Sequence, residues 1–170
     1  MLHPALAHFA ISLPVISLIL GLLYLFKPSE TMSKISTRFL VFAALFMVAA
    51  FFSGRSDAPL VFDFLSTEGQ GLLVQHAKLG LYLAIAMGVT AVIKMYGCFK
   101  NMFKVEMIAV VLLLLITGAT LFQGKLGGAL TYQYGANVVE AQELSKQVKV
   151  MKAELSMCED DDEDEDEDEE

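Results

Sequence analysis

Residues 3–26 read HPALAHFAISLPVISLILGLLYLF, an apolar run long enough to cross a lipid bilayer as one helix. Pro4 suits the first turn of a helix, where the missing N–H would have had no intrahelical partner. Pro14 lies inside the run and should bend the helix close to His8. No basic residue precedes the run, so it predicts a mature helix rather than a cleaved signal peptide. Two of the chain's three histidines, His3 and His8, lie at the beginning of this segment.

Three more apolar runs follow. The four expected spans are residues 4–26, 37–53, 72–93 and 105–122. The 170-residue chain is 55% hydrophobic, with a mean hydropathy of +0.56, which is too apolar for an ordinary soluble domain. The sequence therefore predicts an all-α membrane protein, a four-transmembrane-helix bundle over residues 1–138.

The C-terminal region differs in composition from the rest. In residues 139–157, apolar side chains recur at spacings of four, three and four, which predicts an amphipathic helix. Its stripe consists of Leu144, Val148, Met151 and Leu155. This helix could pack on a surface or form a short coiled coil in a homodimer. Residues 158–170 contain EDDDEDEDEDEE and predict a disordered, solvated tail, which also explains most of the net charge of −8.

Basic residues near the span ends predict the orientation. The first and third connections carry six of them: Lys27, Lys34, Arg38, Lys94, Lys100 and Lys104. The opposite side carries three, namely Arg55, Lys78 and Lys125. We therefore expect both termini on the outer side of a bacterial cytoplasmic membrane. Residues 51–71 are expected to form an outer loop, and residues 124–138 an outer re-entrant or interfacial turn.

All three histidines fall on this outer side. His3 is expected just before the first helix, while His8 and His76 each lie one turn or more inside a span and are level in depth, roughly 6 Å into their helices. This shared face is the one candidate site in the sequence.

Three pieces of the chain resemble an uncharacterised bacterial membrane-protein family, domain of unknown function 2231. They are HPALAHF at residues 3–9, the pair Gly54 and His76, and GGALTYQYG at residues 127–135. The resemblance covers roughly residues 1–138 and implies the fold and topology, but no catalytic residue. Ala10 and Gln133 depart from the typical pattern, which has a proline and a basic residue there.

The first functional hypothesis is one b-type haem for electron transfer at the outer surface, with His8 and His76 as axial ligands. Arg55, Lys78 and Lys125 could pair with the haem propionates. One haem near the outer face cannot carry electrons across a core of about 30 Å. The chain would therefore exchange electrons with a quinol, an external carrier or a respiratory or other membrane subunit.

The second hypothesis is a copper or zinc site in which His3 joins His8 and His76. The third is a membrane subunit or assembly factor that binds no cofactor, with histidines that are simply solvated or hydrogen-bonded.

No hydrolase, P-loop, dinucleotide or zinc-protease motif occurs, so there is no motif-based case for an enzyme. Scattered basic residues and an acidic tail do not support nucleic-acid binding. His8, His76, Lys78 and Glu106 are the ionisable residues expected inside the spans, too few for a continuous proton path.

Overall fold

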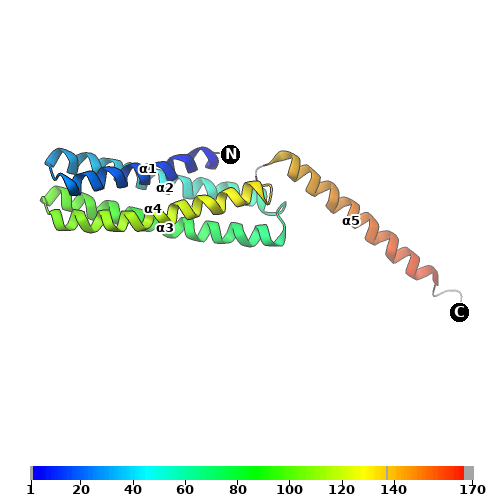
Figure 1. Ribbon diagram of the computed structural model, residues 1–170. Helices are drawn as coiled ribbons and strands as arrows, with labels where there is room; N and C mark the ends of the chain where they lie inside the picture. Colours follow the sequence, from blue (N-terminus) through cyan, green and yellow to red (C-terminus); the bar gives the residue numbers. More distant parts are fainter. Residues whose placement is uncertain (1, 137, 167–170) are drawn as a thin grey trace.

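The computed structural model describes residues 2–136 and 138–166, and this part of the chain is helical, without strands (Figure 1). Its five helices are α1 (His3–Phe26), α2 (Glu30–Phe62), α3 (Thr67–Lys100), α4 (Phe103–Tyr132) and α5 (Val139–Asp166). The first four form an antiparallel bundle, and α5 extends away from one end of it (Figure 1). The predicted all-α, four-helix membrane fold is confirmed.

Each helix of the bundle packs against two others. α1 and α3 both contact α2 and α4, so α1 and α3 lie diagonally across the bundle. The main core lies between α2, α3 and α4: Leu40, Ala44, Met47, Leu83, Ala84, Met87, Ala91, Leu113 and Ile116. α1 approaches closely because most of its buried residues are small, namely Ala10, Pro14, Ser17 and Gly21. A Cβ added at Gly21 would lie 2.9 Å from the Val110 side chain.

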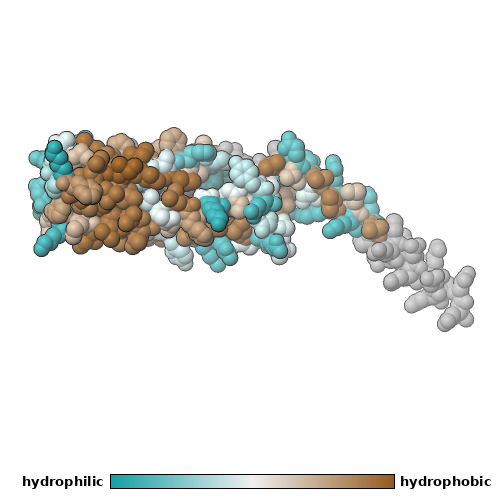
Figure 2. Space-filling model, in the orientation of Figure 1, coloured by the Kyte–Doolittle hydropathy of each residue, from teal (hydrophilic) through white to brown (hydrophobic). Residues whose placement is uncertain are grey.

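The outside of the bundle is apolar. All four helices contain a window that is long and hydrophobic enough to cross a membrane, and at most 39% of any such window is buried inside the protein. The remaining side chains form a hydrophobic surface over the part of the bundle away from α5 (Figure 2). Contact between water and an apolar surface of this extent is unfavourable, so lipid must cover the surface. The chain is therefore an integral membrane protein.

The connections are shorter than the sequence predicted. α1 and α2 are joined by residues 27–29, α2 and α3 by residues 63–66, and α3 and α4 by residues 101 and 102. The expected outer loop over residues 51–71 is therefore wrong, since most of it is helical. A formed helix gains a hydrogen bond with each added residue, so it extends in both directions until capping residues end it. Ser29 and Ser66 are the N-caps of α2 and α3, and their side chains accept hydrogen bonds from Met32 N and Gly69 N.

The expected interfacial turn at residues 124–138 is also wrong in its first part, because α4 continues as a helix to Tyr132. Beyond the apolar run, α4 still has apolar residues to bury: Leu130 packs with Leu65 and Ala136. α2 and α3, with 33 and 34 residues, are roughly 50 Å long, against about 30 Å of hydrocarbon. The bundle therefore extends out of the membrane at the end nearer α5.

α5 is longer than expected, since its backbone stays helical through residues 158–166, where the sequence predicted a disordered tail. Helix propagation from the strong helix formers before this point accounts for the difference. The last predicted tail residues, 167–170, lie outside the described residues. The first half of α5 contacts the α2–α3 connection: Ser145 Oγ donates to Phe64 O at 3.3 Å, and Lys149 Nζ donates to Asp63 O.

Candidate functional site

Two histidines meet at the end of the bundle from which α5 projects. His3 is the first residue of α1, and His76 lies on α3. Their ring centres are 6.3 Å apart, and the ring planes are nearly perpendicular at 87°. Because α1 and α3 lie diagonally, these rings bridge the inside of the bundle rather than two adjacent helices.

The His3 ring is fixed against α2. Its Nδ1 donates to Ala50 O at 2.8 Å and lies 3.2 Å from Ser53 Oγ, while the His3 backbone N–H donates to Asp57 Oδ2 at 3.3 Å. Gly54 makes room for the ring, since an added Cβ would lie 2.8 Å from His3 Cε1. In a neutral imidazole, a bond from Nδ1–H to a carbonyl selects the tautomer whose Nε2 can bind a metal.

The His76 ring is held less completely. Gln123 Nε2 on α4 donates to His76 O at 2.8 Å, and a Cβ at Gly127 would lie 3.1 Å from His76 Cε1. His76 Nδ1 is buried and has no hydrogen-bond partner among the described residues. A buried ring nitrogen without a partner is costly.

His8 does not join this pair. It is exposed, and its Nδ1 donates to Pro4 O of its own helix at 2.6 Å. Arg55, Lys78 and Lys125 are exposed as well. Within the described part of the chain, no group of three or more His, Cys, Asp or Glu side chains could hold a metal ion. The three-histidine copper or zinc site is therefore not assembled.

The predicted depths of the histidines also need correction. α3 begins at Thr67 rather than at residue 72, so His76 lies nine residues, or roughly 14 Å, into its helix. α1 begins at His3, which was expected just outside the helix. The N-terminal end of α3 extends beyond its apolar run, so His76 lies deeper in its helix than expected. This places it level with His3 at the beginning of α1.

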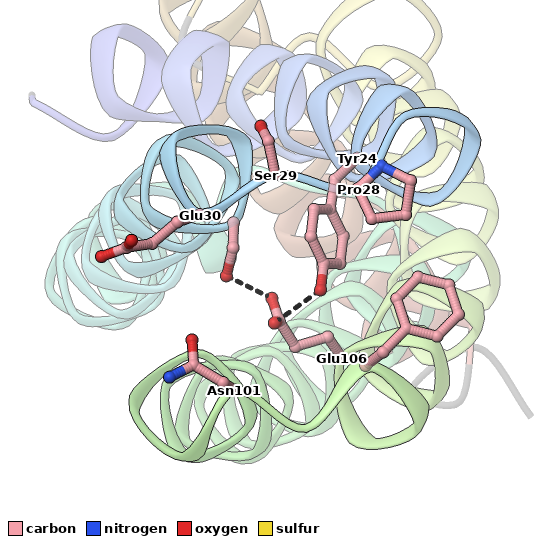
Figure 3. A pocket seen from close by; sticks show the side chains of 8 residues that line it. Tyr24, Pro28, Ser29, Glu30, Asn101 and Glu106 are labelled. Carbon is pink, nitrogen blue, oxygen red and sulfur yellow. Dashed lines mark hydrogen bonds between the residues drawn. The ribbon is translucent and has the colours of Figure 1, made fainter.

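A second polar cluster lies at the opposite end of the bundle and contains one residue from each of the four helices. Figure 3 shows its Tyr24 and Glu106 side chains. Glu106 on α4 accepts from Tyr24 OH at 2.8 Å and from Ser33 Oγ at 2.7 Å, on different carboxylate oxygens. Lys94 on α3 forms an ion pair with Glu106, and its Nζ lies 4.2 Å from the centre of the Tyr24 ring. Gly97 leaves space for the Glu106 side chain.

This cluster was not predicted, because Lys94 lies just beyond the apolar run of the third span, where a loop was expected. Lys94 and Glu106 are in fact among the most deeply buried large side chains, each 1% exposed. A signal was present: a lysine at the end of one apolar run and a glutamate at the start of the next, 12 residues apart. A tight turn brings such positions together.

The two clusters lie one membrane thickness apart. Lys94 follows His76 by 18 residues of continuous helix, or roughly 27 Å, close to the hydrocarbon thickness of about 30 Å. The histidine pair and the ion pair therefore lie near the two boundaries of the hydrocarbon core, where polar groups are less costly than at its centre.

Comparison with known proteins gives a family but no characterised relative. A family model described as "Predicted membrane protein (DUF2231)" matches residues 1–140. The searches of curated proteins and of solved structures found no match.

Proposed function

The chain belongs to the DUF2231 family of predicted membrane proteins, and from this premise we propose that His3 and His76 hold one redox metal centre at the outer end of the bundle. The favoured centre is the iron of a b-type haem. The observation that carries the proposal is the 6.3 Å separation of the two ring centres. Imidazole nitrogen binds metals at about 2 Å, so two rings facing one ion have centres on the order of 6 Å apart.

The surroundings of the rings support the same site. His3 has the Nδ1-to-carbonyl bond typical of metal-binding histidines, and the His76 ring has a buried nitrogen without a partner. The exposed cations Arg55, Lys78 and Lys125 belong to the same end of the helices and could pair with propionates. A haem there would exchange single electrons at the outer surface with a quinol, an external carrier or a partner subunit.

The visible spectrum tests this function. Protein purified in mild detergent should show a Soret band that sharpens on dithionite reduction, with resolved α and β bands. His3→Ala and His76→Ala should each lose these bands, whereas His8→Ala, the matched control, should keep them. Loss in His8→Ala with retention in His3→Ala would restore the axial pair expected from the sequence.

Metal analysis of the same samples separates the alternatives. Stoichiometric copper or zinc in colourless protein would favour a small metal ion on the two imidazoles. Neither haem nor metal after cofactor-replete expression would overturn the proposal and favour a membrane subunit or assembly factor without a cofactor.

We also propose an orientation and a self-association for the chain. The basic residues predict that the histidine end and both termini face the outside of a bacterial cytoplasmic membrane. The apolar stripe of α5, whose Leu144, Met151 and Leu155 are largely exposed, supports pairing with the α5 of a second copy.

A further inference from the structure

Two adjoining pockets open at the ion-pair end of the bundle, opposite the histidines. Each has a volume of about 360 Å³, and they share Glu30 and Asn101. The first also contains Tyr24 and Glu106 (Figure 3), and the second contains Thr37, together with Met95 and Phe99. The pockets lie between the start of α2 and the α3–α4 turn.

The second pocket contains a polar group that lacks a partner. Thr37 is only 7% exposed, and its hydroxyl makes no hydrogen bond among the described residues. Other buried threonines in the bundle behave differently: Thr117 and Thr120 donate to the carbonyl four residues back, at 2.7 and 2.8 Å. Leaving a buried hydroxyl unpaired costs free energy. The Thr37 hydroxyl is therefore available to a group that enters the pocket.

The charges around the pockets are balanced. Glu30 and Lys34 form an exposed ion pair at the mouth, and Glu106 is paired with Lys94 inside. Each carboxylate is thus matched by an ammonium group, which favours a ligand with one positive and one negative group over an anion or a cation. The first turn of α2 adds N–H groups of the kind that bind phosphate.

The position of the pockets selects the source of such a ligand. They lie at the boundary of the hydrocarbon core, and Met95 and Phe99 at their edge are exposed on the apolar surface. A ligand whose polar part fills the pocket would therefore have its apolar part in the bilayer. A membrane lipid has this shape, whereas a free phosphate compound does not.

We propose that the pocket at Thr37 binds the headgroup of a zwitterionic phospholipid with a primary ammonium, phosphatidylethanolamine. The ammonium donates to Glu30, the phosphate accepts from Thr37 and Lys34, and the acyl chains lie along Met95 and Phe99. Phosphatidylcholine is excluded from the first of these bonds because its quaternary ammonium has no N–H. Phosphatidylglycerol has no cation for Glu30.

Tryptophan quenching tests this site directly. The chain has no tryptophan, so Phe99→Trp on α3 creates a single fluorescent reporter at the pocket. In a separate variant, Phe42→Trp creates a single reporter on an exposed apolar surface of α2. Brominated phosphatidylethanolamine, phosphatidylcholine or phosphatidylglycerol is mixed into vesicles that contain the full chain. At the Phe99 position we expect phosphatidylethanolamine to be preferred about three- to tenfold over the other two, the range of one or two hydrogen bonds. At position 42 we expect no preference.

Variants connect the preference to the proposed contacts. Thr37→Val removes the hydroxyl at nearly constant volume and should leave the fold at least as stable in detergent. All three lipids carry the phosphate that this hydroxyl contacts, so the variant should weaken quenching by each of them at position 99 by a similar factor. Glu30→Gln with Lys34→Met removes the carboxylate that accepts from the ammonium, so it should abolish most of the preference for phosphatidylethanolamine. The control, Glu143→Gln with Lys146→Met, removes an exposed ion pair on α5 and should change nothing.

Two results would overturn the proposal. Equal quenching by all three lipids at position 99, or an unchanged preference in Glu30→Gln with Lys34→Met, would show that the pocket does not recognise the headgroup. Preference for phosphatidylglycerol would show a site for anionic lipid instead.

Discussion

Gly54 determines where the His3 ring can lie. Its missing side chain lets the ring contact the backbone of α2, since a Cβ at this position would lie 2.8 Å from the ring. The glycine thus serves the site, although glycine in a helix interior costs about 1 kcal/mol relative to alanine.

Gly54→Ala should therefore displace His3 and destabilise the protein by about 1–3 kcal/mol, the usual cost of overpacking. Gly71→Ala is the control, because a Cβ there meets nothing within 4 Å. That variant should be neutral or more stable by up to about 1 kcal/mol. Thermal unfolding in detergent, followed by circular dichroism, measures both. Equal behaviour of the two variants would mean that His3 is not held against α2.

Of the three ion pairs among the described residues, Lys94–Glu106 is the buried one. Lys94→Met leaves a buried carboxylate without its counter-charge and should destabilise the protein by about 3–5 kcal/mol. Adding Glu106→Gln to Lys94→Met removes that charge and keeps one acceptor oxygen for Tyr24 or Ser33, while the amide NH2 can donate to the other hydroxyl. The double variant should therefore be more stable than Lys94→Met alone in the same unfolding assay. If the double variant were no more stable than Lys94→Met, the unpaired charge of Glu106 would not be the cause of the destabilisation.

At the scale of helices, the apolar runs predicted the number, order and approximate centres of the four spans. They could not predict the ends, because α2, α3 and α4 continue into polar sequence until a cap or a turn stops them. The wrong helix end also led to the wrong pair of histidines. With α3 starting at residue 72, His8 was predicted level with His76, whereas the longer α3 places His3 beside His76. Depth along the helices does identify the histidine that meets His76, but only when α3 begins at Thr67.

α5 carries the testable prediction at this scale. Ser145 and Lys149 hold one side of the helix against the α2–α3 connection, so the stripe of Leu144, Val148 and Met151 faces away from it. Met151→Lys should then weaken a dimer, while Val150→Lys should not. The two side chains are equally exposed, at 58% and 57%, but only Met151 belongs to the stripe. Light scattering of the purified protein gives the mass.

The acidic tails add a salt dependence to this dimer. Pairing two α5 helices in parallel brings two sets of 12 carboxylates near each other, and their repulsion is screened by salt. The dimer should therefore be favoured at high ionic strength. A monomer at all salt concentrations, or equal dimerisation of the two lysine variants, would contradict pairing through the stripe.

The whole molecule has an apolar part, over which hydrophobic side chains gather, and a more polar end next to α5 (Figure 2). The sequence placed the polar end outside the cell by counting basic residues, but composition could not show that helices extend beyond the membrane on that side. This extension exists because residues such as Leu65 and Leu130 still bury one another there.

A cysteine series tests this arrangement in a chain with Cys98→Ser and Cys158→Ser. Tyr132→Cys, at a position 91% exposed, should react with a membrane-impermeant maleimide in intact cells. Leu115→Cys, at a position 66% exposed, should not react, because lipid covers it. Phe26→Cys should react only after the cells are opened. The reverse pattern at positions 26 and 132 would place the tail in the cytoplasm.

The distance between the histidine pair and the ion pair makes the protein sensitive to bilayer thickness. A membrane a few ångströms thicker must thin locally, or hydrocarbon must cover one of the two polar clusters, and each outcome costs free energy. Glu106 is bonded to three other helices, so that end resists displacement. Longer acyl chains would therefore dehydrate the histidine end first, so the polarity around His3 and His76 depends on the length of the surrounding lipids.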